Sequence, residues 1–108
     1  PLVWLDNQTQ KFVGEGGLNH KNVEGKDEIE LTYSLRKDYW GKGFAVEIGR
    51  YAIDFAFNKL KLNNIICFTL TSNQQSQRVI EKLGFIYEKD FTHYNLPHKL
   101  YRLKNPNL

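Results

Sequence analysis

Two glycines flank a lysine at Gly41, Lys42 and Gly43, immediately before a run of apolar residues with helical spacing. The N-terminus of a helix presents unpaired amides and a partial positive charge, and glycine leaves those amides uncovered because it has no side chain. Lys42 adds a full positive charge. These residue types in this order can bind a phosphate. A strand-to-helix turn that uses glycine only for its dihedral angles explains the two glycines equally well.

Two common phosphate-binding motifs do not fit this turn. A P-loop has four residues between its glycines and a Ser or Thr after its lysine, whereas Gly43 follows Lys42 here. The dinucleotide fingerprint has a third glycine where Val46 stands, and an acidic residue at the end of the next strand; both are missing. The turn therefore belongs to neither class of nucleotide site.

The acyl-CoA signature Gln/Arg-x-x-Gly-x-Gly/Ala fits the turn in the register Trp40, Gly41, Lys42, Gly43, Phe44 and Ala45. On this basis the chain resembles the GNAT N-acetyltransferases, and in particular the RimJ/RimL branch that acetylates ribosomal-protein N-termini, which commonly has Tyr-Trp-Gly-Lys-Gly-Tyr/Phe-Ala here. Two flanking segments are also similar to that branch, namely ELTYSLRKDYW and SNQQSQRVIEKLGF. The resemblance extends from Trp4 to Leu103. It implies transfer of an acetyl group from acetyl-CoA to a primary amine, such as a protein N-terminus, by direct attack in a ternary complex.

The resemblance also assigns main-chain groups to the cofactor. In the family, the strand before the turn diverges from the next parallel strand, and the pantetheine arm lies in the gap. The backbone of Leu35 and Arg36 would therefore bind the pantetheine and the acetyl carbonyl, and the turn from Trp40 to Ala45 would hold the diphosphate. Trp40 stands where most members of the family have Gln or Arg, but backbone amides do most of the holding in this branch.

Further cofactor contacts are implied for the helix that follows. Asn73 would hydrogen-bond the pantetheine, and Ser76 would lie one turn further on, near the thioester sulfur. Arg78 and Lys82 are four residues apart and share one helix face, from which they could meet the 3′-phosphate. A solvated helix face explains Arg78 and Lys82 equally well.

Acetyl transfer needs a neutral amine, a stabilised oxyanion and a departing thiolate. An α-amino group has a pKa of about 8, so a usable fraction is neutral without a strong base, and backbone amides can hold the oxyanion. The tyrosine that often serves as the general acid in the family, seven residues after the Asn, is replaced by Ile80. We expect Ser76 to take this role, directly or through water; a plain helix-surface hydroxyl is the alternative.

Glu30 is the main candidate for the general base. It lies on an alternating strand whose apolar residues face the other way, so an exposed structural carboxylate is the competing interpretation. Glu15, in a glycine-rich strand, is a second candidate. Some relatives have an acid five residues before the Asn, and Phe68 at this position excludes that arrangement.

Hydrophobic periodicity predicts the elements that must position these residues. Strands are expected at 2–5, 11–18, 28–35 and 64–70, with a polar loop at 19–27; a helix is expected at 43–60, a second one within 72–85, and final antiparallel strands at 85–91 and 99–103. Ser72 or Asn73 would cap the second helix and Gly84 would end it. Pro97 is expected in the last loop, and Gly14, Gly16 and Gly17 suit a bulge or a close backbone contact.

The order of these elements determines the fold class. A strand–helix–strand unit from residue 28 to 70 implies a parallel pair joined by a right-handed crossover. The fold is therefore α+β, with a mixed, mainly antiparallel sheet, a splayed parallel central pair and two helices. The resemblance makes this a GNAT-like core without the family's first strand and first two helices.

Composition limits the remaining function classes. With 108 residues, 41% of them hydrophobic and 25% charged, the chain suits one globular domain. A net charge of +3 without a dense Lys/Arg block gives little support to nucleic-acid binding. No segment is long and apolar enough for a membrane span. The lone Cys67 is best interpreted as a small buried hydrophobe, and its lack of a partner favours a reducing, cytoplasmic environment.

The three histidines, His20, His93 and His98, show no metal-ligand spacing, so no metal site is expected. All three are best interpreted as surface residues, although His98 lies near the last strand and could touch a substrate. Acetyl-CoA and an amine acceptor are thus the expected partners.

The beginning of the chain raises alternatives. Members of the family usually have a strand and two helices before the position of Trp4, so residues 1–108 are expected to form a single GNAT domain that is incomplete at its N-terminus. An exposed first strand could then pair with a second copy and give a homodimer. Two other functions stay open: an acyl-CoA-binding module without turnover, and an acetyltransferase for a small amine such as a polyamine or an aminoglycoside.

Overall fold

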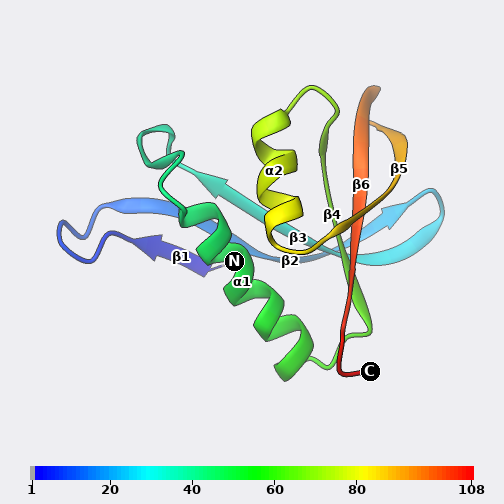
Figure 1. Ribbon diagram of the computed structural model, residues 1–108, viewed down its shortest axis with the longest axis horizontal. Coiled ribbons are helices and arrows are strands. Elements are labelled where there is room, and N and C mark those ends of the chain that lie inside the picture. The colour runs from blue at the N-terminus through cyan, green and yellow to red at the C-terminus, as the bar shows by residue number, and fades with distance from the viewer. Residues whose placement is uncertain (1) are drawn as a thin grey trace.

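A computed structural model describes residues 2–108 of the chain and shows a six-stranded sheet with two helices (Figure 1). The elements are β1 (Leu2–Leu5), β2 (Phe12–Val23), β3 (Lys26–Leu35), a 3-10 turn η1 (Lys37–Tyr39), α1 (Phe44–Asp54), a π-helical turn η2 (Phe55–Lys59), β4 (Asn64–Leu70), α2 (Gln74–Lys82), β5 (Ile86–His93) and β6 (Leu96–Lys104). The strand order is β1-β2-β3-β4-β6-β5, and only β3 and β4 run parallel. The predicted α+β class and order of elements are confirmed.

The prediction of a polar loop at residues 19–27 was wrong. β2 instead continues to Val23, and β3 begins at Lys26. The two residues between them, Glu24 and Gly25, both have positive φ angles of 51° and 84°, which is the conformation that a two-residue hairpin turn requires. The polar residues of this stretch lie on a long hairpin whose side chains largely face solvent, so they show no apolar alternation.

The last hairpin differs from the prediction in the same way. Tyr94 and Asn95 form its turn, with φ angles of 51° and 63°. Pro97 therefore lies within β6, opposite Thr92, and not in the loop.

The helix expected to reach residue 60 is α-helical only to Asp54, after which the chain forms η2.

Two apolar clusters lie on opposite faces of the sheet. The larger one contains residues of both helices, among them Ala52 and Ile80, packed on Leu31, Ile65 and Tyr101 of the sheet. The smaller cluster holds no helical residue and consists of Val23, Ile66, Phe91 and Leu100, with Phe68 packed against it. Both helices thus cover one face, which we call the helix face, and the other is the open face (Figure 1).

Cys67 belongs to the helix-face cluster, and burial raises the pKa of its thiol to about 12. The interpretation as a small buried hydrophobe is confirmed. The interpretation of all three histidines as surface residues was wrong for His98, which is buried. His98 packs edge-on against Phe68, with ring centroids 5.7 Å apart, and its Nδ1 lies 3.0 Å from the Leu96 carbonyl oxygen.

Gly16 of β2 lets α1 lie close to the sheet, and Gly14 lets β3 lie close to β2. A Cβ atom at Gly16 would lie 2.3 Å from Cγ2 of Ile48, and one at Gly14 would lie 2.2 Å from the Ser34 carbonyl oxygen. The close contacts expected for Gly14 and Gly16 are therefore present. The register of β1 and β2 shifts between Trp4 and Leu5, so the irregularity in β2 lies at Val13, beside Gly14. Among residues 2–108, no helix has both the length and the apolar character needed to cross a membrane.

Candidate active site

The parallel pair at the centre of the sheet opens into a cleft. β3 pairs with β4 only where Glu30 lies opposite Ile66, and the two strands diverge beyond that point. The gap and the space above it form a cleft of about 690 Å³, a volume in the usual range for small-molecule sites. Apart from Arg36, Lys42 and the second candidate base Glu15, all predicted site residues line it, namely Glu30, Leu35, Trp40, Gly41, Gly43, Phe44, Ala45, Asn73, Ser76, Arg78 and Lys82.

The glycine turn presents bare main chain to this cleft. Gly41 and Gly43 have φ angles of 75° and 85°, and a Cβ atom at either position would meet nothing within 4 Å. The turn thus needs glycine for its dihedral angles, and the same residues face open space. Gly43 is the N-cap of α1, where no side chain hydrogen-bonds to the helix end. The first amides of α1 can therefore bind an anion, and the residues present fit a diphosphate.

Two predicted contacts are not brought to the cleft. The Lys42 Nζ lies 5.6 Å from the centroid of the Tyr39 ring, outside the lining of the cleft. The Arg36 amide donates a 2.8 Å hydrogen bond to the Val13 carbonyl of β2, and its guanidinium pairs with Asp38 at 3.2 Å. The backbone amide and the guanidinium of Arg36 are thus both bonded to partners outside the cleft.

Trp40 contributes differently from the other turn residues. Its amide donates to the Lys37 carbonyl at 3.2 Å within η1. Its indole Nε1 donates to the Leu35 carbonyl at 3.3 Å, which places the indole against the end of β3. Trp40 therefore lies at the rim of the cleft, and the amides that are free to bind an anion begin after it.

The end of β3 directs other amides into the gap. Successive amides of a strand point to opposite sides, and the Arg36 amide is bonded to β2. The Leu35 and Tyr33 amides therefore point towards β4, which has already diverged. These two donors suit the carbonyl groups of a pantetheine arm and its acetyl group. The family resemblance implied this role for Leu35, whereas it did not name Tyr33.

Two hydroxyl groups meet at the α2 side of the cleft. The Tyr33 hydroxyl from β3 and the Ser76 Oγ from α2 lie 2.9 Å apart. Burial raises the pKa of Tyr33 to about 12, although the contact with Ser76 acts in the opposite direction. Asn73 caps α2, and its Oδ1 accepts a 3.0 Å hydrogen bond from the Ser76 amide. The amide group of the Asn73 side chain is then left as the donor available to a ligand.

Glu30 lines the cleft from the open face. Its carboxyl is half-buried, and this burial raises its pKa, while the positive charge of Lys21 acts in the opposite direction. Phe68 of the open face and Cys67 of the helix face line the same cleft, so the gap between the strands is open to both sides of the sheet. Glu15 is exposed on β2 and is not among the lining residues.

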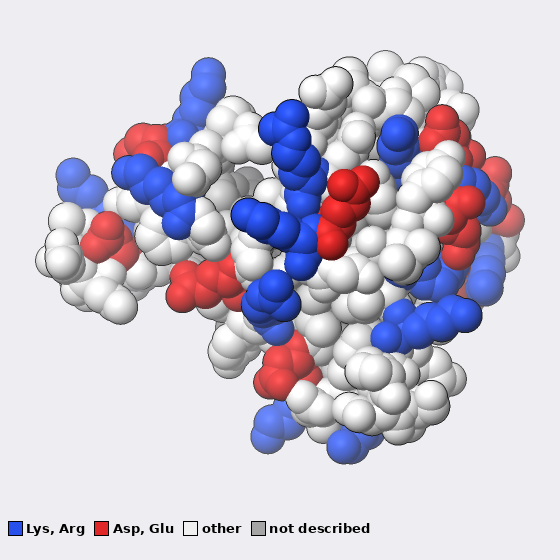
Figure 2. Space-filling model, in the orientation of Figure 1, with Lys and Arg blue, Asp and Glu red and all other residues white. Residues whose placement is uncertain are grey.

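Positive charge gathers beside the cleft on the helix face. Arg78 and Lys82 of α2 are exposed and line the cleft. Arg50 of α1 reaches towards α2, where its Nη2 donates to the Lys82 carbonyl at 3.4 Å. Figure 2 shows Lys and Arg side chains gathered over α2 and the neighbouring part of α1. These charges are placed to attract an anionic ligand.

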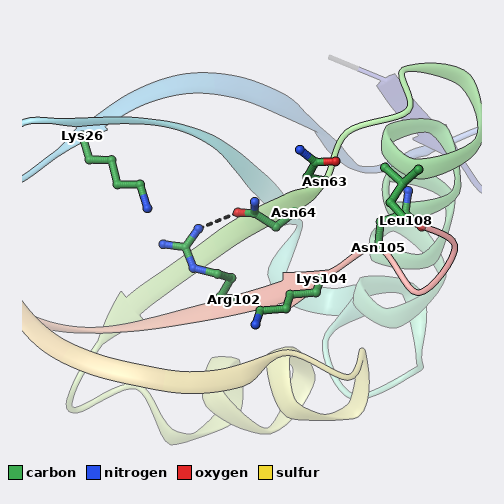
Figure 3. Close-up of a pocket in the computed structure, with 7 residues that line it drawn as sticks. All are labelled: Lys26, Asn63, Asn64, Arg102, Lys104, Asn105 and Leu108. Carbon is green, nitrogen blue, oxygen red and sulfur yellow. Dashed lines mark hydrogen bonds between the residues drawn. The ribbon is translucent and has the colours of Figure 1, made fainter.

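A second hollow, of about 450 Å³, lies near the C-terminus and carries no comparable chemistry (Figure 3). Its central cation, Arg102, is already bound: it donates to both oxygens of Glu28, at 2.9 and 2.7 Å, to Glu88 at 2.7 Å and to Asn64 at 2.5 Å. Arg102 therefore joins β3, β4 and β5 to β6. Among residues 2–108, no group of His, Cys, Asp or Glu side chains is arranged to hold a metal ion.

The chain matches one protein family over most of its length and is similar to several known proteins. Residues 2–86 match the family described as acetyltransferase (GNAT) domain. An uncharacterized protein of Bacillus subtilis (strain 168), YkkB, is 30% identical over 107 residues, which cover 97% of this chain and 62% of the relative. A spermidine N(1)-acetyltransferase of Vibrio cholerae is 31% identical over 93 residues, which cover 77% of this chain and 53% of that enzyme.

A solved structure shares the arrangement of the elements. The ribosomal-protein-S5-alanine acetyltransferase from Vibrio fischeri superposes with a TM-score of 0.79 at 25% identity, covering 95% of this chain and 60% of that one. The chain spans less than two thirds of the length of each of these three proteins.

Proposed function

Because the chain belongs to the GNAT acetyltransferase family, we propose that it transfers the acetyl group of acetyl-CoA to a primary amine. One observation carries the proposal: the uncapped N-terminus of α1, with glycines at positions 41 and 43, opens into the cleft between β3 and β4. A long ligand with a diphosphate near its middle and a thioester at its end can lie along these donors. Family membership and the bare amides together favour acetyl-CoA as this ligand.

Different residues of the cleft have different roles in the proposed reaction. The α1 amides hold the diphosphate, and the Leu35 and Tyr33 amides orient the thioester and stabilise the oxyanion. Acetyl-CoA supplies the activated acetyl group. Glu30 holds its carboxylate at the open face, where it accepts a proton from the attacking amine. Ser76 stands on the opposite side of the gap, near the place of the leaving sulfur.

The acceptor is an α-amine at the end of a peptide. Among the described residues that line the cleft, Glu30 alone carries an acidic group. On the open face, the Nζ of Lys21 lies 6.0 Å from the centroid of Phe68 and 5.6 Å from that of Tyr94. A polyamine carries several positive charges, which this environment repels, whereas an N-terminal α-amine carries one and is more readily neutral. The name of the Vibrio fischeri enzyme, a ribosomal-protein-S5-alanine acetyltransferase, agrees with a protein acceptor.

A binding module without turnover is the second candidate. Ile80 takes the place of the tyrosine that often serves as the acid, and it is fully buried in the core. No proton can come from that position. This alternative predicts acetyl-CoA binding without transfer.

A thiol-release assay separates the two. The 108-residue chain is mixed with acetyl-CoA and one of four acceptors: a peptide with a free N-terminal alanine, the same peptide with a blocked N-terminus, spermidine, or an aminoglycoside. We expect release of free CoA thiol above background only with the unblocked peptide, together with saturable binding of acetyl-CoA in calorimetry. Binding of acetyl-CoA without release of CoA thiol for any amine would support the binding module instead. Faster release with spermidine than with the peptide would contradict the assigned acceptor.

A further inference from the structure

We propose that Tyr33 is a positioning residue for acetyl transfer: its hydroxyl donates to Ser76 Oγ and thereby directs the Ser76 hydroxyl proton towards the leaving sulfur. The inference rests on the proposed function, because it concerns the same cleft. It adds a residue that lies on a strand, 43 positions away from the serine it acts through.

The geometry fixes Ser76 at two points. Its amide donates to Asn73 Oδ1 at 3.0 Å, which holds the first turn of α2 in place. Its Oγ lies 2.9 Å from the Tyr33 hydroxyl, which reaches across from β3. Both side chains are half-buried and both line the cleft. The serine is thus held by its main chain and by its side chain where the strands have separated.

The relative acidity of the two hydroxyl groups gives the direction of the hydrogen bond between Tyr33 and Ser76. Two hydroxyl groups have two protons, and one proton lies between the two oxygens. A phenol is a stronger acid than an aliphatic alcohol, so it is the better donor of the pair. A tyrosine is protonated at neutral pH, and burial raises the pKa of Tyr33 further, to about 12. Tyr33 therefore donates, and the Ser76 proton is left free to point into the cleft.

The free proton has a use in the transfer step. The amine nitrogen forms a bond to the acetyl carbon, and the carbon–sulfur bond breaks with its electron pair leaving on sulfur. The proton lost by the amine goes to Glu30. The sulfur departs as a thiolate that accepts a hydrogen bond from Ser76, so no proton needs to leave Tyr33. A hydroxyl that is already oriented stabilises this charge without reorganising at the moment of reaction.

The test compares Tyr33→Phe, Ser76→Ala and the double variant. We expect Tyr33→Phe to lower kcat about tenfold, as for loss of one hydrogen bond, with an unchanged KM for acetyl-CoA. Ser76→Ala should lower kcat at least as much, and the double variant should match Ser76→Ala because the two groups act as one unit. Tyr87→Phe is the matched control: it loses a hydroxyl that donates to Asp90 at 2.7 Å outside the cleft, and should leave kcat unchanged.

A second readout does not depend on turnover. The pKa of the thiol of bound CoA is followed by the ultraviolet absorbance of its thiolate, with the desulfo-CoA complex as the blank. We expect this pKa to rise by similar amounts in Tyr33→Phe and Ser76→Ala, and not in Tyr87→Phe. A wild-type chain that turns over, while Tyr33→Phe retains the full kcat and thiol pKa, would overturn the inference and leave the proposed function standing. A wild-type chain that binds CoA without turnover would remove the proposed function, and the thiol pKa would then decide the role of Tyr33.

Discussion

Glu30 stands at the point where the central strands separate, and its environment does not favour its charge. The carboxyl is half-buried and has no ion-pair partner within bonding distance among the residues described. Burial raises its pKa, and only the field of Lys21 opposes this shift. Glu28, two residues earlier on the same face, has the opposite environment, since the hydrogen bonds from Arg102 lower its pKa. A carboxylate kept in an unfavourable place is typical of a functional group.

Replacing Glu30 by Gln should therefore stabilise the fold and impair transfer. A carboxyl with a raised pKa favours its neutral form in the folded state. Its contribution to stability is complete below the unfolded pKa of about 4 and is lost as the pH rises through the folded pKa. Glu30→Gln should thus have a higher Tm than the wild type at pH 7 and a similar Tm below that acidic limit. Its kcat/KM should fall and should lose the rise with pH that titration of Glu30 causes.

The matched control for this prediction is Glu15→Gln. Glu15 is a carboxylate on the neighbouring strand, exposed and outside the cleft. It should change neither the rate nor the difference in Tm between the two pH values. Full activity of Glu30→Gln at every pH would exclude Glu30 as the base.

The proposed cofactor site depends on the turn before α1. Gly43 lies in the left-handed region at φ 85°, and Gly25 in the β2–β3 hairpin has nearly the same angle, 84°. A Cβ atom meets nothing within 4 Å at either glycine. The two positions therefore impose the same backbone demand, but only Gly43 faces the cleft.

Glutamate at these two glycines should separate conformational strain from ligand binding. Gly43→Glu and Gly25→Glu should each cost about 1–2 kcal/mol of unfolding free energy, because a side chain is strained at positive φ. Only Gly43→Glu should lose acetyl-CoA affinity, by more than about tenfold, since its charge lies at the uncapped helix end. Chemical denaturation and calorimetry measure the two effects. Equal affinity in both variants would show that this turn does not bind the diphosphate.

The elements of the fold could be predicted largely from the sequence, because apolar residues keep a clear period where a face is buried. The alternation from Ile29 to Leu35 correctly predicted β3, and the helical spacing from Phe44 to Ala56 correctly predicted α1. The apolar period disappears at residues 19–27, where the β2–β3 hairpin extends beyond the two helices (Figure 1). The hairpin there depends on the angles of Glu24 and Gly25, and a glutamate at positive φ is uncommon enough to escape a sequence pattern.

The site could be predicted only in part. The cleft contains most of the residues that the family resemblance implied, because main-chain donors follow from the glycine turn and its flanking strand. Contacts between distant segments do not leave such a pattern. The hydrogen bond from the Arg36 amide to Val13 and the one between Tyr33 and Ser76 depend on how β3 lies against β2 and α2. Tyr33 occupies a position in the apolar series of its strand, with Ile29, Leu31 and Leu35, and this pattern gives no sign that its hydroxyl has a polar partner.

At the scale of the whole molecule, the sheet separates two sides with different charge and chemistry. The helices and the exposed cations Arg78 and Lys82 lie on the helix face, and Glu30 with Lys21 lies on the open face. The gap between β3 and β4 connects the two sides. In the proposed reaction, the anionic donor approaches from the helix face, where the cations gather (Figure 2), and the amine approaches from the open face.

Removing the two cations of α2 should weaken binding through the 3′-phosphate alone. We expect Arg78→Gln/Lys82→Gln to bind CoA about tenfold less tightly than the wild type, as for two solvent-exposed charge pairs, and to show a smaller loss of affinity with added salt. Its affinity for 3′-dephospho-CoA should be almost unchanged. Lys59→Gln/Lys61→Gln, with the same change in net charge, removes exposed lysines beyond the C-terminus of α1 and should bind both ligands normally. An equal loss for CoA and 3′-dephospho-CoA would contradict the assignment to the 3′-phosphate.

The most direct test of the proposed cofactor site is a crystal structure of this chain with bound acetyl-CoA. We expect the diphosphate oxygens to lie within hydrogen-bond distance of the main-chain amides between Gly41 and Ala45, and the thioester to lie between β3 and β4, close to Ser76. A bound cofactor that leaves those amides without a ligand, or whose thioester lies outside the gap between the two strands, would contradict it.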